Sequence, residues 1–275
     1  SLLSEELKPA FVEKLDLDYE RVRDQHNRKK PRTKPVTLEQ ARANKVAIDW
    51  DAYTPPVPAK PGVHVFNDFD VATLRNYIDW TPFFMTWSLV GKYPAILDHE
   101  EVGEEAKRLF KDANELLDRV EREKLLEARG ICAMFPANSV GDDIEVYTDE
   151  SRTKVLKVLH NLRQQTEKPN GFNYCLSDYI APKESGKADW IGGFAVTGGI
   201  GERELADEYK ANGDDYNAIM IQAVADRLAE AFAEYLHQEV RKDIWGYAPD
   251  ENLSNDDLIR EKYQGIRPAP GYAAC

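Results

Sequence analysis

The sequence is poor in cysteine and has no apolar run long enough to cross a membrane. Its three cysteines, Cys132, Cys175 and Cys275, form no Cys-x-x-Cys spacing, so neither a disulfide framework nor a thiolate zinc site is indicated. No apolar run approaches the roughly 20 residues of a membrane-spanning helix, and residues 1–6 lack the basic and apolar regions of a signal peptide. We therefore expect a cytoplasmic protein with no membrane partner.

An excess of positive charge is also missing. The chain has 36 basic and 49 acidic residues, which give a net charge of -13. Such a field repels phosphate at long range, and we therefore expect no nucleic-acid partner. The positive charge that exists is concentrated between Arg28 and Lys34, together with two prolines. This stretch is typical of a flexible tether between folded parts.

Motifs for catalysis, metal binding or phosphate binding are absent. The five histidines form no His-Glu-x-x-His helix and no i+4 pair, and there is no Gly-x-Ser-x-Gly elbow. The segment Gly198-Gly199-Ile200-Gly201 stands where a phosphate loop could lie, but Glu204 replaces the third glycine of a dinucleotide fingerprint. A tight turn from strand to helix is the favoured interpretation. We predict no catalytic residue and no metal site.

What the sequence does contain is enough apolar mass for one large domain or a domain with an arm. Hydrophobic residues make up 42% of the 275 positions. Residues 5–28 and 37–47 predict two helices, and the proline-rich stretch 53–62 must be extended or turning. We place a helical arm and linker at residues 1–61 and a compact domain at residues 62–275. Because residue 1 is not methionine, we expect a piece of a longer protein.

Within the compact domain, short segments bounded by Gly, Pro and Asp predict strands, and longer periodic segments predict helices. The predicted strands are 129–136, 143–147 and 190–196, and the predicted helices are 73–78, 100–124, 151–165 and 214–244. The last helix carries an apolar residue every three or four positions, as in a helix packed on a sheet. Few strands between unequal helical stretches favour an α+β fold with a mainly antiparallel sheet.

Two places could bind a small charged molecule. Asp79 lies in the aromatic stretch 77–87, where it could hold a cation or simply cap a helix that has Pro82 in its first turn. Arg267 opens the hexapeptide Arg-Pro-Ala-Pro-Gly-Tyr, in which two prolines stiffen the backbone between a guanidinium and an aromatic ring. This arrangement suits an amino-acid clamp, and the alternative is an ordinary surface loop with a salt bridge.

These residues are also where the sequence resembles a known family, the activation domain of cobalamin-dependent methionine synthase. The resemblance runs in order over essentially the whole chain. It is carried by the hexapeptide 267–272 and by these further segments: 75–84 (RNYIDWTPFF), 135–138 (FPAN), 141–145 (GDDIE), 194–199 (FAVTGG), 226–230 (DRLAE) and 245–249 (WGYAP).

The resemblance implies a C-shaped α+β domain around a twisted antiparallel sheet, which binds S-adenosylmethionine. The parent enzyme transfers a methyl group from methyltetrahydrofolate to homocysteine through methylcobalamin, and S-adenosylmethionine remethylates cobalamin after oxidation and one-electron reduction. By the resemblance, Asp79 holds the ligand's ammonium and Arg267 its carboxylate. Gly271, Tyr272 and the backbone near Ala274 line the same groove.

The resemblance also implies partners. Lys92, Asp226, Glu230 and Glu261 match positions on the face turned to the cobalamin domain, and the electron donor is a flavodoxin or a diflavin reductase. Cobalamin and zinc belong to other domains of the parent methyltransferase, so we expect no turnover by this piece alone. The family's domain continues past the hexapeptide, and the 62–275 domain is therefore expected to be incomplete. An alternative is a docking module that binds no ligand.

One apparent cobalamin motif does not fit. Asp24-Gln25-His26 matches the start of the Asp-x-His-x-x-Gly signature with which cobalamin-binding domains supply a histidine to cobalt. Lys29 stands at the glycine position, and the surroundings are the basic linker. The sequence therefore disfavours His26 as a cobalt ligand.

Overall fold

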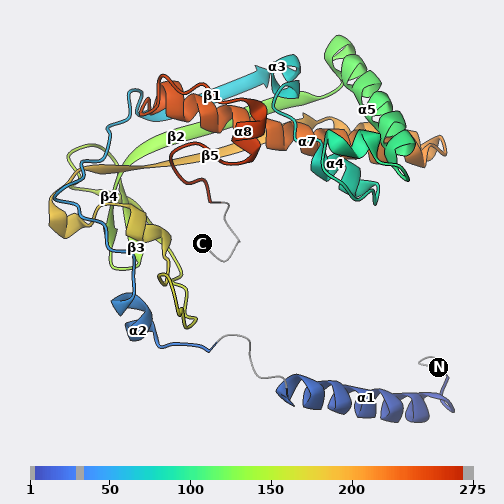
Figure 1. The fold of residues 1–275 in the computed structure, drawn as a ribbon, viewed down its shortest axis with the longest axis horizontal. Coiled ribbons are helices and arrows are strands. Elements are labelled where there is room, and N and C mark those ends of the chain that lie inside the picture. Colours follow the sequence, from blue (N-terminus) through green and yellow to red (C-terminus); the bar gives the residue numbers. More distant parts are fainter. Residues whose placement is uncertain (1–3, 29–33, 269–275) are drawn as a thin grey trace. The chain divides into compact units, whose positions relative to one another are not determined.

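The computed structural model describes residues 4–28 and 34–268, and Figure 1 shows their fold. The chain divides into two compact units. One consists of Ser1–Val46 and Arg163–Cys175, and the other of Ala47–Leu162 and Leu176–Cys275. Residues 47–61 group with the larger unit, and the boundary between residues 61 and 62 stays a prediction.

The smaller unit contains two helices, α1 (Lys8–Arg28) and α2 (Leu38–Ala43). Helix α2 begins with a capping box in which Thr37 and Gln40 bond each other's backbone N–H groups. The segment after Arg163 is held to this helix by the side chain of Asn44, which donates to Asn173 over 2.8 Å. Two helices were predicted here, and both are present.

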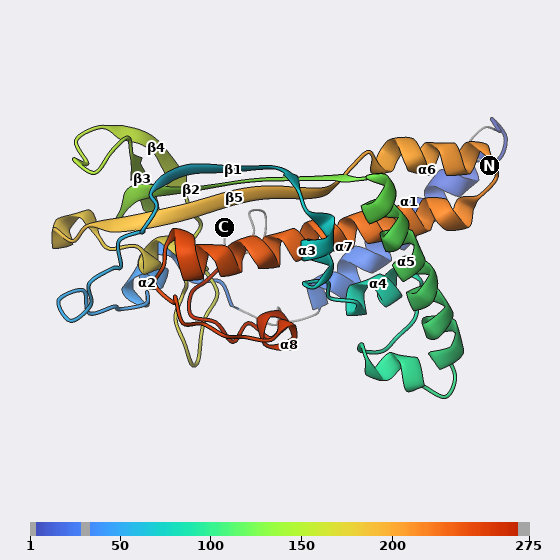
Figure 2. The ribbon, with the colours of Figure 1, turned by 90° about the horizontal axis from the view of Figure 1, so that it is seen from above.

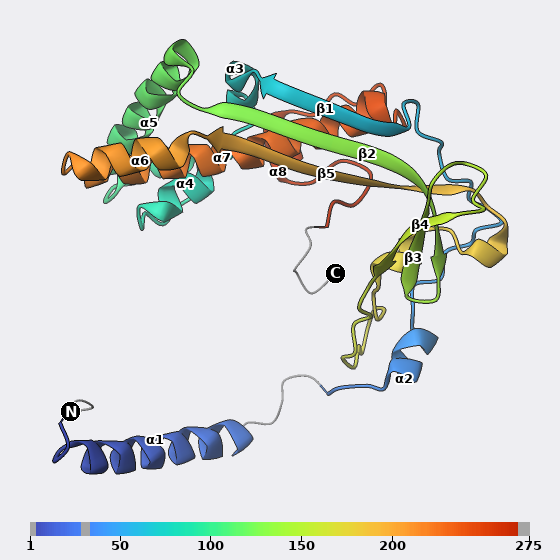
Figure 3. The ribbon, with the colours of Figure 1, turned by 180° about the vertical axis from the view of Figure 1, so that it is seen from behind.

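The larger unit is built on one antiparallel sheet. Its strands are β1 (Gly62–Phe69), β2 (Glu127–Val140), β3 (Asp143–Tyr147), β4 (Val155–His160) and β5 (Asp189–Ile200). The long strand β2 pairs with β1, β3 and β5, and β4 pairs with β3. Figure 3 shows the β3–β4 hairpin at the end of β2 that lies far from α5. The α+β fold with a mainly antiparallel sheet is confirmed.

Helices flank this sheet. They are α3 (Val71–Arg75), α4 (Thr81–Thr86), α5 (Gly103–Glu123), α6 (Glu202–Ala211), α7 (Asp215–Glu239), the π-helical turn η4 (Val240–Ile244) and α8 (Asn255–Ile259), with 3-10 turns η1 (Ala95–Asp98), η2 (Leu176–Tyr179) and η3 (Lys183–Ser185). Helix α7 runs along the sheet (Figure 2). Its Phe232 ring lies so near β2 that a Cβ on Gly130 would come within 2.8 Å of it. The apolar stripe predicted for residues 214–244 therefore faces the sheet.

The glycine segment after residue 197 lets α7 approach the sheet and then turns the chain. A Cβ on Gly198 would lie 2.7 Å from the Leu228 backbone, and one on Gly199 would lie 2.8 Å from the Ala225 Cβ. Gly201 has a φ of +100° at the N-cap of α6, where side chains other than glycine are strained. The predicted strand-to-helix turn is confirmed.

One predicted helix, residues 151–165, is wrong. The segment instead forms β4, an edge strand whose register places Ile144 opposite Leu159 and Asp143 opposite His160. Apolar residues at 155, 158, 159 and 162 imitate a helical period in the sequence. The turn between β3 and β4 is not helical, because Arg152 adopts a φ of +54°. The Arg152 guanidinium donates to backbone carbonyls of β2 and β5, which holds this turn against the sheet.

Candidate ligand-binding site

Helix α7 carries a row of polar side chains near its C-terminal end. Glu234, His237 and Gln238 of α7 and Arg241 of the following turn η4 stand at positions i, i+3, i+4 and i+7, which places them on one face of the helix. His237, Gln238 and Arg241 are buried. Buried polar groups are costly unless they are hydrogen-bonded, so the partners of this row determine what the face does.

The segment after α8 lies on this face of α7. The Tyr263 ring meets the His237 ring edge-on at a centroid distance of 4.7 Å and lies 4.2 Å from the guanidinium carbon of Arg241. Next, the Tyr247 hydroxyl donates to the Gln264 carbonyl over 3.0 Å. Gly265 follows with a φ of +118°, and a Cβ there would lie 2.6 Å from the same hydroxyl. Glycine at 265 therefore lets the segment pass close to Tyr247, and the residues that follow Gly265 reach α7.

Arg241 has an acidic partner that it bonds twice, although its Nη1 atom is buried without a hydrogen-bond partner among the described residues. Its side chain is fully buried and donates to both carboxylate oxygens of Glu251, over 2.8 Å from Nε and 2.6 Å from Nη2. Such a two-pronged pair fixes geometry as well as charge. The pair thus attaches the stretch before α8 to the π-helical turn η4.

Arg267 is paired less completely. Its Nη2 bonds and forms an ion pair with Oε1 of Glu234, and the two side chains are 21% and 17% exposed. Arg267 Nη1 and Glu234 Oε2 are also buried, and neither has a hydrogen-bond partner among the described residues. An unsatisfied buried donor or acceptor costs about 1–3 kcal/mol. The pair therefore offers one donor and one acceptor to a further group.

His237 precedes both arginines in sequence and remains neutral. Burial, reinforced by the positive charges of Arg241 and Arg267, lowers the pKa of His237 from 6.5 to about 3. Its Nδ1 is a further buried atom that has no partner within the part of the chain that the structure describes. The imidazole therefore adds hydrogen-bonding capacity without adding charge.

The loop that carries Asp79 is attached to the same helices. The Tyr77 hydroxyl donates to Gln238 Oε1 over 2.7 Å, and Asn255 Nδ2 donates to the Ile78 carbonyl over 3.3 Å. Asp79 itself is half-buried and accepts a hydrogen bond from the Thr81 N–H over 2.9 Å. It therefore caps the first turn of α4 from one residue before the N-cap position, which is occupied by Trp80.

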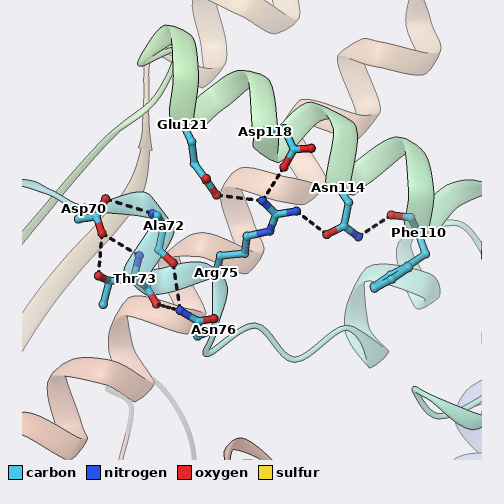
Figure 4. Close-up of polar contacts among 9 residues, drawn as sticks. All are labelled: Asp70, Ala72, Thr73, Arg75, Asn76, Phe110, Asn114, Asp118 and Glu121. Atoms are coloured by element: carbon cyan, nitrogen blue, oxygen red, sulfur yellow. Dashed lines mark hydrogen bonds and ion pairs between the residues drawn. The ribbon is translucent and has the colours of Figure 1, made fainter.

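A cluster around Arg75 fixes helix α3, which precedes this loop (Figure 4). Arg75 donates to Asp118 over 2.7 Å, to Glu121 over 3.1 Å and to Asn114 over 2.8 Å, and all three partners come from α5. Asp70 caps α3 by accepting from the N–H groups of residues 72 and 73. The cluster holds the start of the loop against α5.

The structure brings some of the predicted site residues together. Asp226 and Glu230 are exposed on α7 and precede Glu234 at four-residue steps, so the three carboxylates form one row. Glu261 is exposed in the turn after α8, with a φ of +53°. Lys92 is exposed in the loop before η1. Gly271, Tyr272 and Ala274 lie outside the described residues.

Sequence reasoning missed the polar row of α7 and its partners. The row interrupts an otherwise apolar helix. Polar residues at helical spacing within such a helix could have indicated a polar face in the sequence. Glu251 and Tyr263 carry no such signal, because they reach α7 only through the fold. Arg267 does form a salt bridge, with Glu234 as the partner, and the choice between a surface loop and an amino-acid clamp stays a prediction.

This arrangement suits a zwitterion better than a metal ion. It provides a guanidinium donor and a carboxylate acceptor side by side, each with an unused atom. Across the described ranges, no group of three or more His, Cys, Asp or Glu side chains could hold a metal ion. In the same residues, no helix is long and apolar enough to span a membrane.

Comparison with known proteins identifies what this fold and site resemble. Residues 70–275 match the model of the family described as the vitamin B12-dependent methionine synthase activation domain. A crystal structure of the MetH reactivation domain bound to AdoHcy is 67% identical in sequence and superposes with a TM-score of 0.86. The match covers 88% of this chain and 74% of that chain.

Proposed function

Because the chain belongs to the family of activation domains of vitamin B12-dependent methionine synthase, we propose that it binds S-adenosylmethionine on the polar face of α7. Arg267 holds the ligand's carboxylate and Asp79 its ammonium. The relative that is 67% identical contains AdoHcy, the demethylated form of the same molecule, which supports the proposal. The observation that carries it is the Arg267–Glu234 pair with its two unpartnered atoms.

The described residues fit such a ligand chemically. An α-amino acid carries a carboxylate, which accepts hydrogen bonds, and an ammonium, which donates them. Arg267 Nη1 is a buried donor in need of an acceptor, whereas Glu234 Oε2 and Asn255 Oδ1 are buried acceptors in need of donors. A zwitterion supplies both kinds of group and removes the cost of leaving them unsatisfied.

The role of the domain follows from its family. When bound, S-adenosylmethionine supplies the methyl group with which cobalamin is remethylated after reduction. The residues of this chain bind and orient the ligand, and the buried face of α7 excludes water from the charged groups, which strengthens their interactions. In this proposal, the domain restores the activity of the methyltransferase to which it belongs and does not turn over alone.

Isothermal titration calorimetry of the 275-residue chain with S-adenosylmethionine tests the proposal. We expect saturable binding of one ligand per chain, and no methylthioadenosine or AdoHcy when the incubated ligand is then analysed by chromatography. Turnover in the absence of cobalamin would instead indicate a stand-alone enzyme. If there is no heat of binding and no thermal shift, the proposal is wrong and a docking module remains.

We further propose that the acidic row Asp226–Glu230 and the residues Lys92 and Glu261 face the cobalamin domain of the same polypeptide. The electron donor is a flavodoxin or a diflavin reductase. Such donors are generally acidic, and a chain of net charge -13 attracts them only through a local basic patch. Lys92 is exposed and is our candidate for such a patch, whereas Lys29 and Lys30 of the linker lie outside the described residues.

Reactivation of the parent enzyme by its flavoprotein tests this docking. We expect the rate at limiting flavoprotein to fall as salt rises, because exposed charges more than about 10 Å apart are screened at 0.1 M ionic strength. Lys92→Glu should lower the rate at low salt, whereas Lys210→Glu, which reverses an exposed charge in the last turn of α6, should not. A rate that is indifferent to salt and to Lys92→Glu rules out Lys92 docking.

A further inference from the structure

Glu234 carries a negative charge beside the ligand, and its effect goes beyond the hydrogen bonds of the proposed clamp. It is the partner of Arg267 in the described structure, it is 17% exposed, and its Oε2 atom is buried without a hydrogen-bond partner among the described residues. A carboxylate held in this way is desolvated, and its charge acts over several ångströms with an effective dielectric constant of about 20. Glu234 therefore influences any charged ligand on this face.

The charges around Glu234 can be counted one by one. Arg241 is balanced by Glu251, which takes both of its forked donors. Arg267 is balanced by Glu234, and His237 is neutral because burial lowers its pKa to about 3. These buried and partly buried groups are therefore neutral as a set, and Asp79 in the adjoining loop adds one negative charge, whereas Asp226 and Glu230 of the same helix are exposed to solvent.

The two forms of the ligand differ by one positive charge. S-adenosylmethionine carries a sulfonium in addition to the zwitterionic amino acid, whereas AdoHcy has a neutral thioether. A site with one net negative charge complements the sulfonium of S-adenosylmethionine. With AdoHcy bound, the same negative charge has no positive partner. If Glu234 lost its charge, the same site would be neutral and would no longer favour the cation.

We propose that Glu234 is a specificity-determining residue, which makes the site prefer the methylated sulfonium over the demethylated thioether. This inference rests on the proposed function and names the residue that selects between the two ligands. The preference serves the reaction, because the domain must release the thioether product and take up the sulfonium. Arg267 alone cannot provide it, since both ligands present the same amino-acid group to the guanidinium.

The test compares the dissociation constants of S-adenosylmethionine and AdoHcy, measured by calorimetry on the wild-type chain and on Glu234→Gln. Glutamine keeps an oxygen that can accept from Arg267 and removes only the charge. We expect the ratio of the two constants to shift toward AdoHcy on the order of tenfold. Glu234→Met removes the charge in another way, and either variant that retains the wild-type circular dichroism spectrum should give the same shift.

A matched control is available in the Arg75 cluster. Glu121 pairs with Arg75 over 3.1 Å, and these side chains are 26% and 28% exposed, close to the values for Glu234 and Arg267. Glu121→Gln should leave the ratio unchanged. A ratio that is the same in the wild type and in a folded charge-free variant overturns the role of Glu234. If the wild type binds neither ligand, the proposed function fails first, and this inference fails with it.

Discussion

Arg75 and Arg267 are both partly buried arginines with acidic partners in the same unit. They differ in how many of the buried polar atoms around them have hydrogen-bond partners. Arg75 bonds three side chains of α5, and none of the unpartnered buried polar atoms found in the described residues belongs to this cluster. Arg267 bonds one carboxylate, and each member of that pair has a buried atom without a partner. Buried polar groups are nearly always satisfied, so a donor and an acceptor that are unpartnered within one ion pair are a candidate for ligand binding.

The difference has a structural origin. The partners of Arg75 are three residues of one regular helix at spacings of four and three. The helix therefore arranges them around Arg75 without the help of a ligand. Arg267 reaches α7 at the end of an irregular segment that depends on Gly265, Tyr247 and Tyr263. We therefore interpret the first arginine as a support and the second as a binding group.

The largest effect that separates the two arginines concerns ligand affinity. Arg267→Ala should weaken binding of S-adenosylmethionine by about 2–4 kcal/mol, roughly 30- to 1000-fold, because the ligand's carboxylate loses its desolvated charged partner. Arg267→Lys should lose less, since lysine keeps the charge but not the fork. Calorimetry measures both values.

Arg75→Ala is the control for this measurement, and its affinity should stay within about twofold of the wild type at a temperature where the variant is folded. Equal affinities for the wild type and Arg267→Ala would remove residue 267 from the site and would end the comparison between the two arginines.

The second effect concerns stability, and here we expect Arg75 to matter more than Arg267. Arg75→Met should lower the free energy of unfolding by about 1–3 kcal/mol, because it breaks hydrogen bonds to two carboxylates and one amide that are only partly solvated. Urea denaturation followed by circular dichroism measures the loss. A variant as stable as the wild type would show that the cluster is not a support.

The third effect is a pH dependence that belongs to the Arg267 region. His237 has a folded-state pKa of about 3 against 6.5 when unfolded. Below pH 6.5 the unfolded chain therefore binds a proton that the folded chain excludes, and stability falls as the pH drops toward 3, by roughly 1.4 kcal/mol per unit once the unfolded histidine is protonated.

Replacing the histidine should remove this slope. His237→Phe keeps a ring against Tyr263, and its unfolding free energy should change less between pH 6.5 and pH 4.5 than that of the wild type. Arg75→Met should keep the wild-type slope, because its cluster contains no histidine. Identical slopes for His237→Phe and the wild type would mean that the imidazole is solvated.

The smallest effect is expected when the incomplete pair is replaced as a whole. The double variant Glu234→Gln with Arg267→Met removes both charges, so its stability without ligand should lie within about 1 kcal/mol of the wild type. Its affinity for S-adenosylmethionine should nevertheless fall as far as that of Arg267→Ala. A large loss of stability would show that the pair, like the Arg75 cluster, supports the fold.

Much of the fold could be predicted because the local signals agree with the tertiary structure. The apolar stripe of residues 214–244 predicted one helix, which the structure divides into α7 and the π-helical turn η4, and strand 143–147 was predicted with its observed bounds. The predicted helix 151–165 failed because an edge strand exposes most of its side chains, so its apolar residues follow no strand pattern. Strand β1 was not predicted, although Val63 and Val65 alternate with half-buried residues.

The site could be predicted only in part. Asp79 and Arg267 were singled out from their sequence surroundings, and the family resemblance gave them their ligand roles; the structure attaches both segments to α7. Glu234 was not named, because its importance depends on Arg267, which is 33 residues away in sequence. The cost of an unpartnered atom is likewise a property of the folded environment, and no residue type reveals it.

A crystal structure of this chain with S-adenosylmethionine would show directly whether Arg267 binds the ligand. We expect the ligand's carboxylate on Nη1 of Arg267, with Glu234 still facing the guanidinium and with no unpartnered atom left in the pair. A ligand whose amino-acid group lies away from residue 267, with Nη1 and Oε2 still unpartnered, would contradict this expectation.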